Sequence, residues 1–390
     1  MRVTHIITRL VIGGAQENTL ATVRGLRAKS GVEVKLISGP TIGPEGSLEM
    51  EAAKIPGLLT LVPELVRPVR PLKDFIALRK LEKILREQSP DIVHTHSGKA
   101  GILGRLAAKR AGVPIIIHHI HGPSFGDFQG VLANFAFTAA EKYAARVTDH
   151  FFCSADAMKK KYLAAGIGRP RQYTRIFSGF AVERFSAAGN DPVFRRRLGF
   201  LPEDFIIGAI ARLVPRKGHR DLFAALQKMP PGCPAARLLL VGGGGLRTEL
   251  ERLARQMGLA DKIVFAGLVP PGEVPRYVGV MDCVAHLSTF PEALSRALPQ
   301  ALAAGKPVVA YDFDGADEVC RENETGFLVR TGDTAAAARR LLQLAGDPAL
   351  REKLGRCGQA FVRENFSIEK MVADQYDVYL KLAAERGLRV

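Results

Sequence analysis

The chain has 390 residues, of which 47% are hydrophobic and 24% charged, so it is expected to fold as two globular domains of roughly 150–200 residues each. It contains no run of about 18 or more uncharged apolar residues, and it opens directly on a strand pattern. These features argue against a membrane-spanning helix and a signal peptide and favour a cytoplasmic location.

The net charge is +16, and residues 1–175 hold 26 Lys and Arg against 14 Asp and Glu, whereas the remainder holds 29 against 25. A basic first half suits an anionic partner, either a phosphate-bearing substrate or an anionic bilayer, although a merely solvated basic surface would have the same composition. Nucleic acid is not expected, because no basic–aromatic recognition signature accompanies the charge.

The first half alternates short apolar runs with longer amphipathic segments. The predicted strands are Arg2–Thr8, Gly31–Ile37, Asp91–His94, Pro114–Ile120, His150–Cys153 and Tyr173–Phe177. The predicted helices between them are Ala15–Lys29, Pro71–Glu87, Lys99–Ala111, Leu132–Arg146 and Ala155–Ala165. Such alternation predicts an α/β domain with a parallel, doubly wound sheet.

The second half repeats this scheme. Its predicted strands are Phe205–Ile210, Arg237–Val241, Ile263–Phe265, Cys283–Leu287 and Pro307–Ala310, separated by helices Arg220–Met229, Leu246–Met257 and Ala293–Ala304. We therefore predict a first domain at 1–185, a linker at 186–204 and a second domain at 205–367, with the C-terminal helix in 368–390 returning to the first domain. Ligands on such sheets bind beyond the carboxyl ends of the strands, so a cleft between the two domains is the expected site.

A pair of glycines follows the first strand. Gly13 and Gly14 open the first predicted helix, where a bare backbone can approach a ligand and the helix N-terminus favours an anion. An ordinary strand–helix turn explains the pair equally well.

Two cations follow the first strand of the second half. Arg212 and Lys217 lie between a buried strand and a helix, a position from which both can reach a ligand and neutralise a diphosphate. Arg216 lies between them and is either uninvolved or an accessory cation.

The glycine run Gly242–Gly245 does not indicate a dinucleotide site. The pattern Gly-x-Gly-x-x-Gly would require a small residue at position 247, where the chain has Arg247. The sequence also lacks a Walker loop and the motif His-Glu-x-x-His. A nicotinamide-dependent dehydrogenase is therefore not expected.

The segment Ser288–Ala310 reads as strand end, loop, helix, glycine stop and strand. Glu292 is predicted near the helix start, where it either caps the helix or accepts hydrogen bonds from sugar hydroxyls. The backbone amides of Ala293, Leu294 and Ser295 would face a diphosphate.

His121 ends the strand Pro114–Ile120 and follows His118 and His119. A strand-end position facing a cleft favours contact with a ligand over a purely structural role. Of the three histidines only His119 and His121 share a face, no carboxylate set completes a site, and the five cysteines are scattered singly. No metal site is therefore expected.

Together these residues resemble glycosyltransferase family 4, the retaining enzymes with the GT-B fold of two Rossmann-like domains. The likeness covers nearly the whole chain and rests on Gly13–Gln16, Asp91–His96, His121-Gly122, Arg212 with Lys217-Gly218, and Glu292 with Gly305–Ala310.

The resemblance implies a metal-independent enzyme without a cofactor that uses a nucleotide-diphosphate sugar, with a UDP-sugar favoured. Arg212 and Lys217 would neutralise the leaving diphosphate, His121 and Glu292 would contact the donor sugar, and the remaining contacts to the donor would come from Gly13, Gly14, Gly243, Leu268, Ala293, Leu294, Ser295 and Gln300. Gln300 departs from the family, which has a glutamate there that binds the ribose; a neutral amide is a poorer partner for a diol.

The implied acceptor is a glycan or lipid-linked hydroxyl in bacterial surface polysaccharide synthesis, with peripheral contact to the inner membrane face as one possibility. Phe125 and Phe128 either touch that acceptor or belong to the local core. Two other functions are left open: a nucleotide-sugar epimerase or phosphorylase-like enzyme, and a non-catalytic nucleotide-sugar-binding protein.

Overall fold

The computed structural model describes residues 1–41, 46–230 and 235–388, which form two compact units. The first unit comprises Met1–Phe180, the short segment Pro291–Leu294 and the residues from Ile368, and the second comprises Ala181–Phe290 and Ser295–Ser367. The segment 186–204, predicted as a linker, lies within the second unit. There it carries a short helix whose Arg195 is buried and donates to the carbonyl of Leu201.

The first unit contains a parallel seven-stranded sheet with strand order β3-β2-β1-β4-β5-β6-β7. Its strands are β1 (Arg2–Ile7), β2 (Glu33–Ser38), β3 (Leu59–Leu61), β4 (Ile92–His96), β5 (Ile115–Ile120), β6 (His150–Cys153) and β7 (Tyr173–Arg175). Its helices are α1 (Gly14–Arg27), α2 (Glu49–Ala53), α3 (Pro71–Gln88), α4 (Gly98–Ala111), α5 (Val131–Ala145), α6 (Asp156–Ala164) and α15 (Ile368–Glu385).

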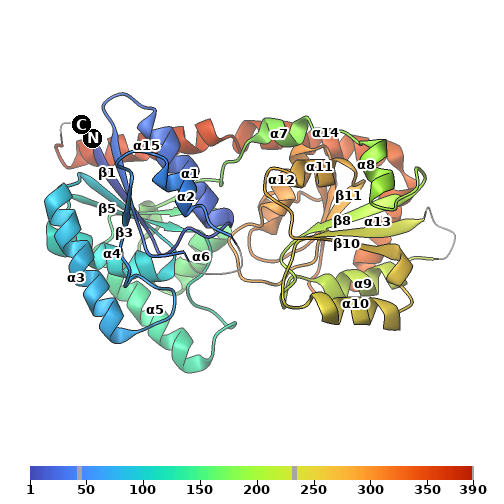
Figure 1. The fold of residues 1–390 in the computed structure, drawn as a ribbon, viewed down its shortest axis with the longest axis horizontal. Helices are drawn as coiled ribbons and strands as arrows, with labels where there is room; N and C mark the ends of the chain where they lie inside the picture. The colour runs from blue at the N-terminus through green and yellow to red at the C-terminus, as the bar shows by residue number, and fades with distance from the viewer. Residues whose placement is uncertain (42–45, 231–234, 389–390) are drawn as a thin grey trace. The chain divides into compact units, whose positions relative to one another are not determined.

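Helices cover both faces of this sheet (Figure 1). On one face Val23 and Leu26 of α1 and Tyr379 of α15 pack with the strand residues Val3 and Ile117. On the other face α3 and α4 pack against Ile6, Val93 and their neighbours. Strand β5, with the sequence Ile-Ile-Ile-His-His-Ile, is buried throughout, as expected for a parallel strand covered on both sides.

The second unit contains a parallel six-stranded sheet with order β10-β9-β8-β11-β12-β13. Its strands are β8 (Phe205–Ile210), β9 (Ala236–Val241), β10 (Ile263–Gly267), β11 (Cys283–His286), β12 (Val308–Tyr311) and β13 (Gly326–Val329). Its helices are α7 (Val182–Ser186), α8 (Pro192–Arg197), α9 (His219–Gln227), α10 (Arg247–Gln256), α11 (Val274–Gly279), α12 (Ala297–Ala303), α13 (Thr334–Gly346) and α14 (Pro348–Asn365).

The predicted fold class is confirmed, because both units are parallel α/β sheets. In each sheet the order reverses direction once, between β1 and β4 in the first unit and between β8 and β11 in the second. At such a switch point the connections leave toward opposite faces and open a crevice at the carboxyl edge. Functional side chains are therefore expected there.

No helix in the described ranges is long and apolar enough to cross a membrane. Cys153, Cys283, Cys320 and Cys357 are free thiols, and Cys233 lies outside the described residues.

Candidate functional site

The two predicted cations of the second unit meet at its switch point. Arg212 follows β8, and its guanidinium carbon lies 5.6 Å from the centre of the Phe290 ring, beyond the end of β11. The ammonium nitrogen of Lys217 lies 4.5 Å from the centre of the same ring. An aromatic face attracts cations and packs against their aliphatic side chains, so both charged groups lie near the Phe290 ring. Phe290 was not predicted as a site residue from the sequence.

Backbone hydrogen bonds connect the loops at this edge. The amide of Leu213 donates to the carbonyl of Gly243 at 2.8 Å, and that of Gly242 donates to Gly267 at 2.9 Å. The amide of Thr289 donates to the carbonyl of Arg216 at 2.8 Å. These bonds fix the loops that follow β8, β9 and β11 relative to one another, so the cations stand on a rigid base.

The turn between the two cations requires an unusual backbone. Arg216 has a φ of 68°, and Gly218 caps the start of α9 with a φ of 78°. A Cβ at Gly218 would lie 2.0 Å from the carbonyl oxygen of Leu287, so only glycine fits. This tight passage brings the N-terminus of α9 and Lys217 against the end of β11. The Arg216 side chain is exposed.

Gly243 and Leu268 are also neighbours. A Cβ at Gly243 would lie 3.4 Å from the Cβ of Leu268, whose side chain is 71% exposed. The loops after β9 and β10 therefore form one wall in which a bare backbone faces an exposed apolar side chain. The contact of Gly243 and Leu268 with the donor stays a prediction.

The helix predicted at Ala293–Ala304 is shorter than expected, because α12 begins at Ala297. Pro299 lies in its first turn, where a missing amide hydrogen is tolerated, and the proline ring would clash with the carbonyl four residues earlier in a longer helix. The predicted helix start at Ala293 is therefore wrong, and Ala293, Leu294 and Ser295 precede the helix; contact of their amides with a diphosphate stays a prediction. Glu292 is half-buried in the same irregular segment, and Gln300 is half-buried on α12.

Glu292, Ala293 and Leu294 group with the first unit and Ser295 with the second. Ala293 is buried in a cluster with Ile120 and Phe125. Phe125 is thus a core residue, whereas Phe128 is 38% exposed, so contact with an acceptor stays a prediction for Phe128 alone.

Gly13 and Gly14 lie at the carboxyl edge of β1 in the first unit. Gly13 is the N-cap of α1, with no side-chain cap, and Gly14 is its first residue. The Gly13 carbonyl accepts from the Glu17 amide at 2.9 Å, while the Gly14 backbone is exposed. The start of α1 is therefore exposed backbone at Gly14, while the side-chain oxygen of Gln16 lies 3.0 Å from the position that a Cβ of Gly13 would take.

His121 belongs to a larger histidine cluster at the switch point of the first sheet. His5 of β1, His94 and His96 of β4, and His119 of β5 share one face with His121, and the rings of His119 and His121 stack 4.0 Å apart. Burial lowers the pKa of His5 and of His121 to about 3. Burial also holds the pKa of His94, His96 and His119 well below the usual value, so all five rings are neutral at pH 7.

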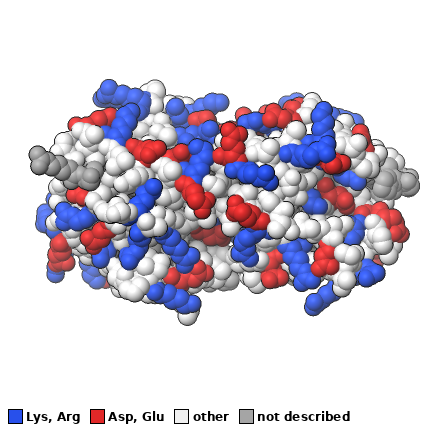
Figure 2. All heavy atoms as spheres, turned by 90° about the horizontal axis from the view of Figure 1, so that it is seen from above, with Lys and Arg blue, Asp and Glu red and all other residues white. Residues whose placement is uncertain are grey.

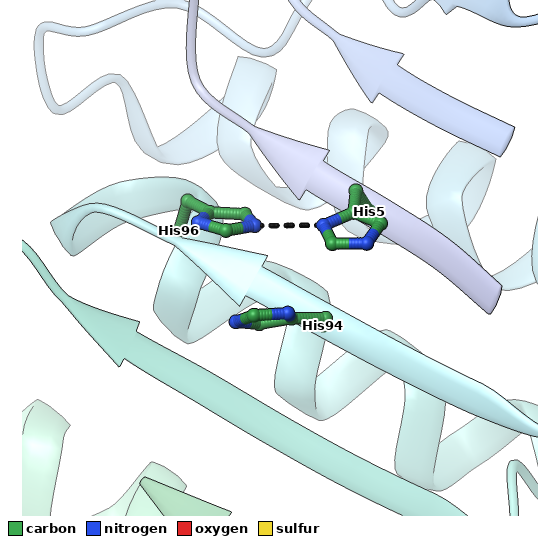
Figure 3. Close-up of side chains that lie close together, drawn as sticks. All are labelled: His5, His94 and His96. Atoms are coloured by element: carbon green, nitrogen blue, oxygen red, sulfur yellow. Dashed lines mark hydrogen bonds between the residues drawn. The ribbon is translucent and has the colours of Figure 1, made fainter. Parts of the chain in front are cut away.

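Two sets of three rings come close enough to be considered for a metal: His5, His94 and His96 (Figure 3), and His96, His119 and His121, with one nitrogen of each ring within 4.8 Å of the others. Among the described residues no carboxylate or thiolate joins either set. Several of these nitrogens instead hydrogen-bond to one another, and a doubly charged ion without an anionic ligand would be costly in this buried place. The arrangement fits neutral hydrogen-bonded rings better than a metal.

A buried ion pair supports the loop after His121. Arg105 of α4 and Glu141 of α5 are both fully buried and bond at 2.6 Å. The second carboxylate oxygen accepts from the Ser124 hydroxyl at 2.9 Å, and this hydroxyl also contacts the Tyr162 hydroxyl at 3.1 Å. Three helices thereby anchor the chain three residues beyond His121.

Comparison with known proteins gives matches over both units. The family "Glycosyl transferase 4-like domain" matches residues 13–176, and "Glycosyl transferases group 1" matches residues 190–361. EpsD of Bacillus subtilis (strain 168), which is named as a glycosyltransferase, is 30% identical over 311 residues that cover 77% of this chain and 79% of EpsD. The UDP-Gal:alpha-D-GlcNAc-diphosphoundecaprenol alpha-1,3-galactosyltransferase of Escherichia coli is 27% identical over 83% of this chain and 84% of its own length.

Two solved structures share the fold. Alr3699/HepE of Anabaena, in complex with UDP, superposes with a TM-score of 0.81 over 98% of this chain and all of its own, at 22% identity. Sucrose-phosphate synthase of Thermosynechococcus elongatus superposes with a TM-score of 0.80 over 99% of this chain and all of its own, at 20% identity.

Proposed function

Because the chain belongs to the family 4 glycosyltransferases with the GT-B fold, we propose that it transfers the sugar of a UDP-sugar to a hydroxyl of a lipid-linked glycan. The transfer retains the anomeric configuration in this proposal. The observation that carries the proposal is the meeting of Arg212 and Lys217 on the Phe290 ring, at the switch point where such sheets bind ligands.

The donor diphosphate gains negative charge as the bond to the sugar breaks. Arg212 can hold two phosphate oxygens at once, Lys217 adds a point charge, and the first amides of α9 follow directly. Groups fixed where charge develops are commonly the largest catalytic contribution, worth about 3 kcal/mol each. With two cations in place, we propose that the reaction does not need a metal.

The remaining donor contacts follow from the same edges. The bare backbone of Gly243 beside Leu268 would receive the uracil ring, and Gln300 would meet the ribose with one amide. His121 and Glu292 would contact the sugar, and Gly13 and Gly14 would offer the donor a bare backbone. UDP is the proposed nucleotide because the names of the E. coli relative and of the Anabaena complex both include it.

The acceptor proposal rests on the surface of the first unit. Val131, Leu132 and Phe135 on α5, with Phe128 before it, form what we call the α5 patch; the three helical side chains are 86%, 86% and 74% exposed. Exposed apolar side chains of this size mark contact with a partner or a membrane. The name of the E. coli relative includes a diphosphoundecaprenol acceptor, an anionic lipid that a basic, partly apolar surface would receive.

The face drawn in Figure 2 shows Lys and Arg interspersed with Asp and Glu, without a continuous basic area. The charge surplus of residues 1–175 is therefore not concentrated on that face. We propose that the enzyme is cytoplasmic and makes peripheral contact with anionic lipid through the α5 patch, where Lys161 lies next to the loop at Gly126.

The donor site is tested by sugar transfer to a polyprenyl-diphosphate-linked sugar, with and without EDTA, and by NMR of the anomeric proton in the product. We expect Arg212→Ala to lower kcat about a hundredfold. Arg216→Asn is the matched control, because it removes a neighbouring cation and asparagine tolerates the left-handed backbone. Equal rates for the Arg212→Ala variant and the parent, or the same loss in both variants, would contradict the assignment.

The lipid contact is tested by sedimentation with vesicles that contain anionic phospholipid. We expect Leu132→Ser/Phe135→Ser to reduce binding severalfold, while Phe75→Ser, which removes an exposed aromatic ring from α3, leaves it unchanged. Binding that is insensitive to the α5 change would remove the α5 patch from the proposal.

A further inference from the structure

Three rings of the histidine cluster form one continuous hydrogen-bonded chain. Nδ1 of His5 lies 2.9 Å from Nε2 of His96, and Nδ1 of His96 lies 3.0 Å from Nε2 of His121. Figure 3 shows the first of these contacts, between rings on β1 and β4, with His94 beside them. Both nitrogens of His96 are therefore in use, one toward each neighbour.

A neutral imidazole has one N–H and one lone pair, so His96 must donate at one end and accept at the other. Only two arrangements are possible. Either the hydrogen bonds run from His5 through His96 to His121, or all of them run in reverse. The tautomer of His121 is thus coupled to that of His5 through the ring between them.

The far end of the chain decides the direction. Nε2 of His5 is fully enclosed and has no hydrogen-bond partner among the residues that the structure describes. In the reverse direction it would carry a hydrogen, and a buried N–H without an acceptor is rarer and costlier than a bare lone pair. The chain therefore runs from Nδ1–H of His5 to His96, and from Nδ1–H of His96 to Nε2 of His121.

We propose that His5 and His96 are positioning residues that hold His121 as the Nδ1–H tautomer, so that it meets the donor sugar as a neutral hydrogen-bond donor and not as a base. This deepens the proposed function and rests on it for the role in transfer. Nε2 of His121 accepts from His96 in this arrangement, so the hydrogen of the neutral ring lies on Nδ1.

The surrounding groups do not disturb this assignment. His94 bonds through Nδ1 to the Tyr379 hydroxyl at 2.5 Å, and His119 bonds through Nε2 to the Ser154 hydroxyl at 3.2 Å. The low pKa of His96 comes from burial and from its four histidine neighbours. These bonds lead away from the three hydrogen-bonded rings. His94 and His119 are buried beside those rings, but they do not determine the direction of the hydrogen bonds between them.

The tautomer can be observed by long-range ¹H–¹⁵N NMR of the full chain with labelled histidine, because the protonated and bare nitrogens of a neutral ring have distinct shifts. We expect the Nδ1–H pattern for His121 between pH 6 and 8. His96→Leu removes the donor to Nε2, so His121 loses the bond that selects its Nδ1–H form and should show both tautomers. His96→Asn keeps an N–H near the position of Nδ1 and should restore the parent pattern.

His94→Asn is the matched control. It removes a buried ring from the same face, but His94 is not one of the three hydrogen-bonded rings His5, His96 and His121. The variant should therefore leave the His121 tautomer unchanged. In the transfer assay we expect His96→Leu to lower kcat about tenfold with little change in KM, and His96→Asn to recover most of that loss.

An Nε2–H form of His121 in the parent protein, no change in His96→Leu, or one equivalent of tightly bound metal in the purified protein would each overturn the proposal. An unchanged kcat with an altered tautomer would refute the role in transfer. If no nucleotide sugar is a substrate, the proposed function fails, while the NMR result still decides the tautomer.

Discussion

Acidification should destabilise the first unit strongly. His5, His94, His96, His118 and His119 are at most 2% exposed, and burial lowers the pKa of each, to about 3 for His5. In the unfolded chain the same rings titrate near 6.5. The free energy of unfolding is therefore highest above pH 6.5 and falls as the pH drops below that value, because the unfolded state then binds more protons than the folded state.

The magnitude follows from linkage. At pH 5.5 each histidine that stays neutral when folded lowers the free energy of unfolding by about 1.4 kcal/mol relative to high pH. Five such rings amount to about 7 kcal/mol, which is comparable with the whole stability of a typical domain. The first unit should therefore be close to unfolding at pH 5.5.

The measurement is urea unfolding of the full chain at pH 7.5 and 5.5, followed by far-UV circular dichroism. His118→Asn provides the control, because its side-chain oxygen can keep the 2.9 Å contact that Nδ1 of His118 makes with the Thr95 hydroxyl. This variant should lose about 1.4 kcal/mol less than the parent over the same pH interval. Unfolding curves that coincide at the two pH values would refute the reasoning.

Three further changes test the supports of the site. Glu141→Gln leaves the buried charge of Arg105 without its partner and should cost about 3–5 kcal/mol in urea unfolding; a loss below 1 kcal/mol would show that the pair is not enclosed. Gly218→Ala puts a Cβ 2.0 Å from a backbone carbonyl and should cost about 3 kcal/mol with loss of transfer, and normal stability would contradict the left-handed turn. Tyr379→Phe should lower the free energy of unfolding by about 1 kcal/mol, because His94 loses its hydrogen-bond partner, and this should appear as a lower melting temperature. An unchanged melting temperature would argue against that hydrogen bond.

The sequence determined the elements and their class. The predicted strands His150–Cys153 and Phe205–Ile210 have the observed ends, because continuous apolar runs between turns mark strands covered on both faces. Strand β3 was missed, since three residues at the sheet edge give no periodicity, and β13, α13 and α14 were not assigned. The start of α12 at Ala297 could have been predicted from Pro299.

The cations of the site were also predictable, since Arg212 and Lys217 stand between a strand and a helix in the printed sequence. Their meeting on Phe290 was not, because that ring follows β11, which lies beside β8 only in the folded sheet. Sequence spacing says which residues leave a strand at its carboxyl end. Strand order alone says which of those ends are neighbours.

The histidine chain shows the same division. The spacing of His94 with His96 and of His119 with His121 places each pair on one face of its strand, and that much follows from a period of two. The bond between His5 and His96 joins positions 91 residues apart. It exists because β1 and β4 pair in the middle of the sheet, and the neutrality of the rings exists because two layers of helices exclude water from them. Local sequence carries neither pairing nor burial, since both are properties of the packed sheet.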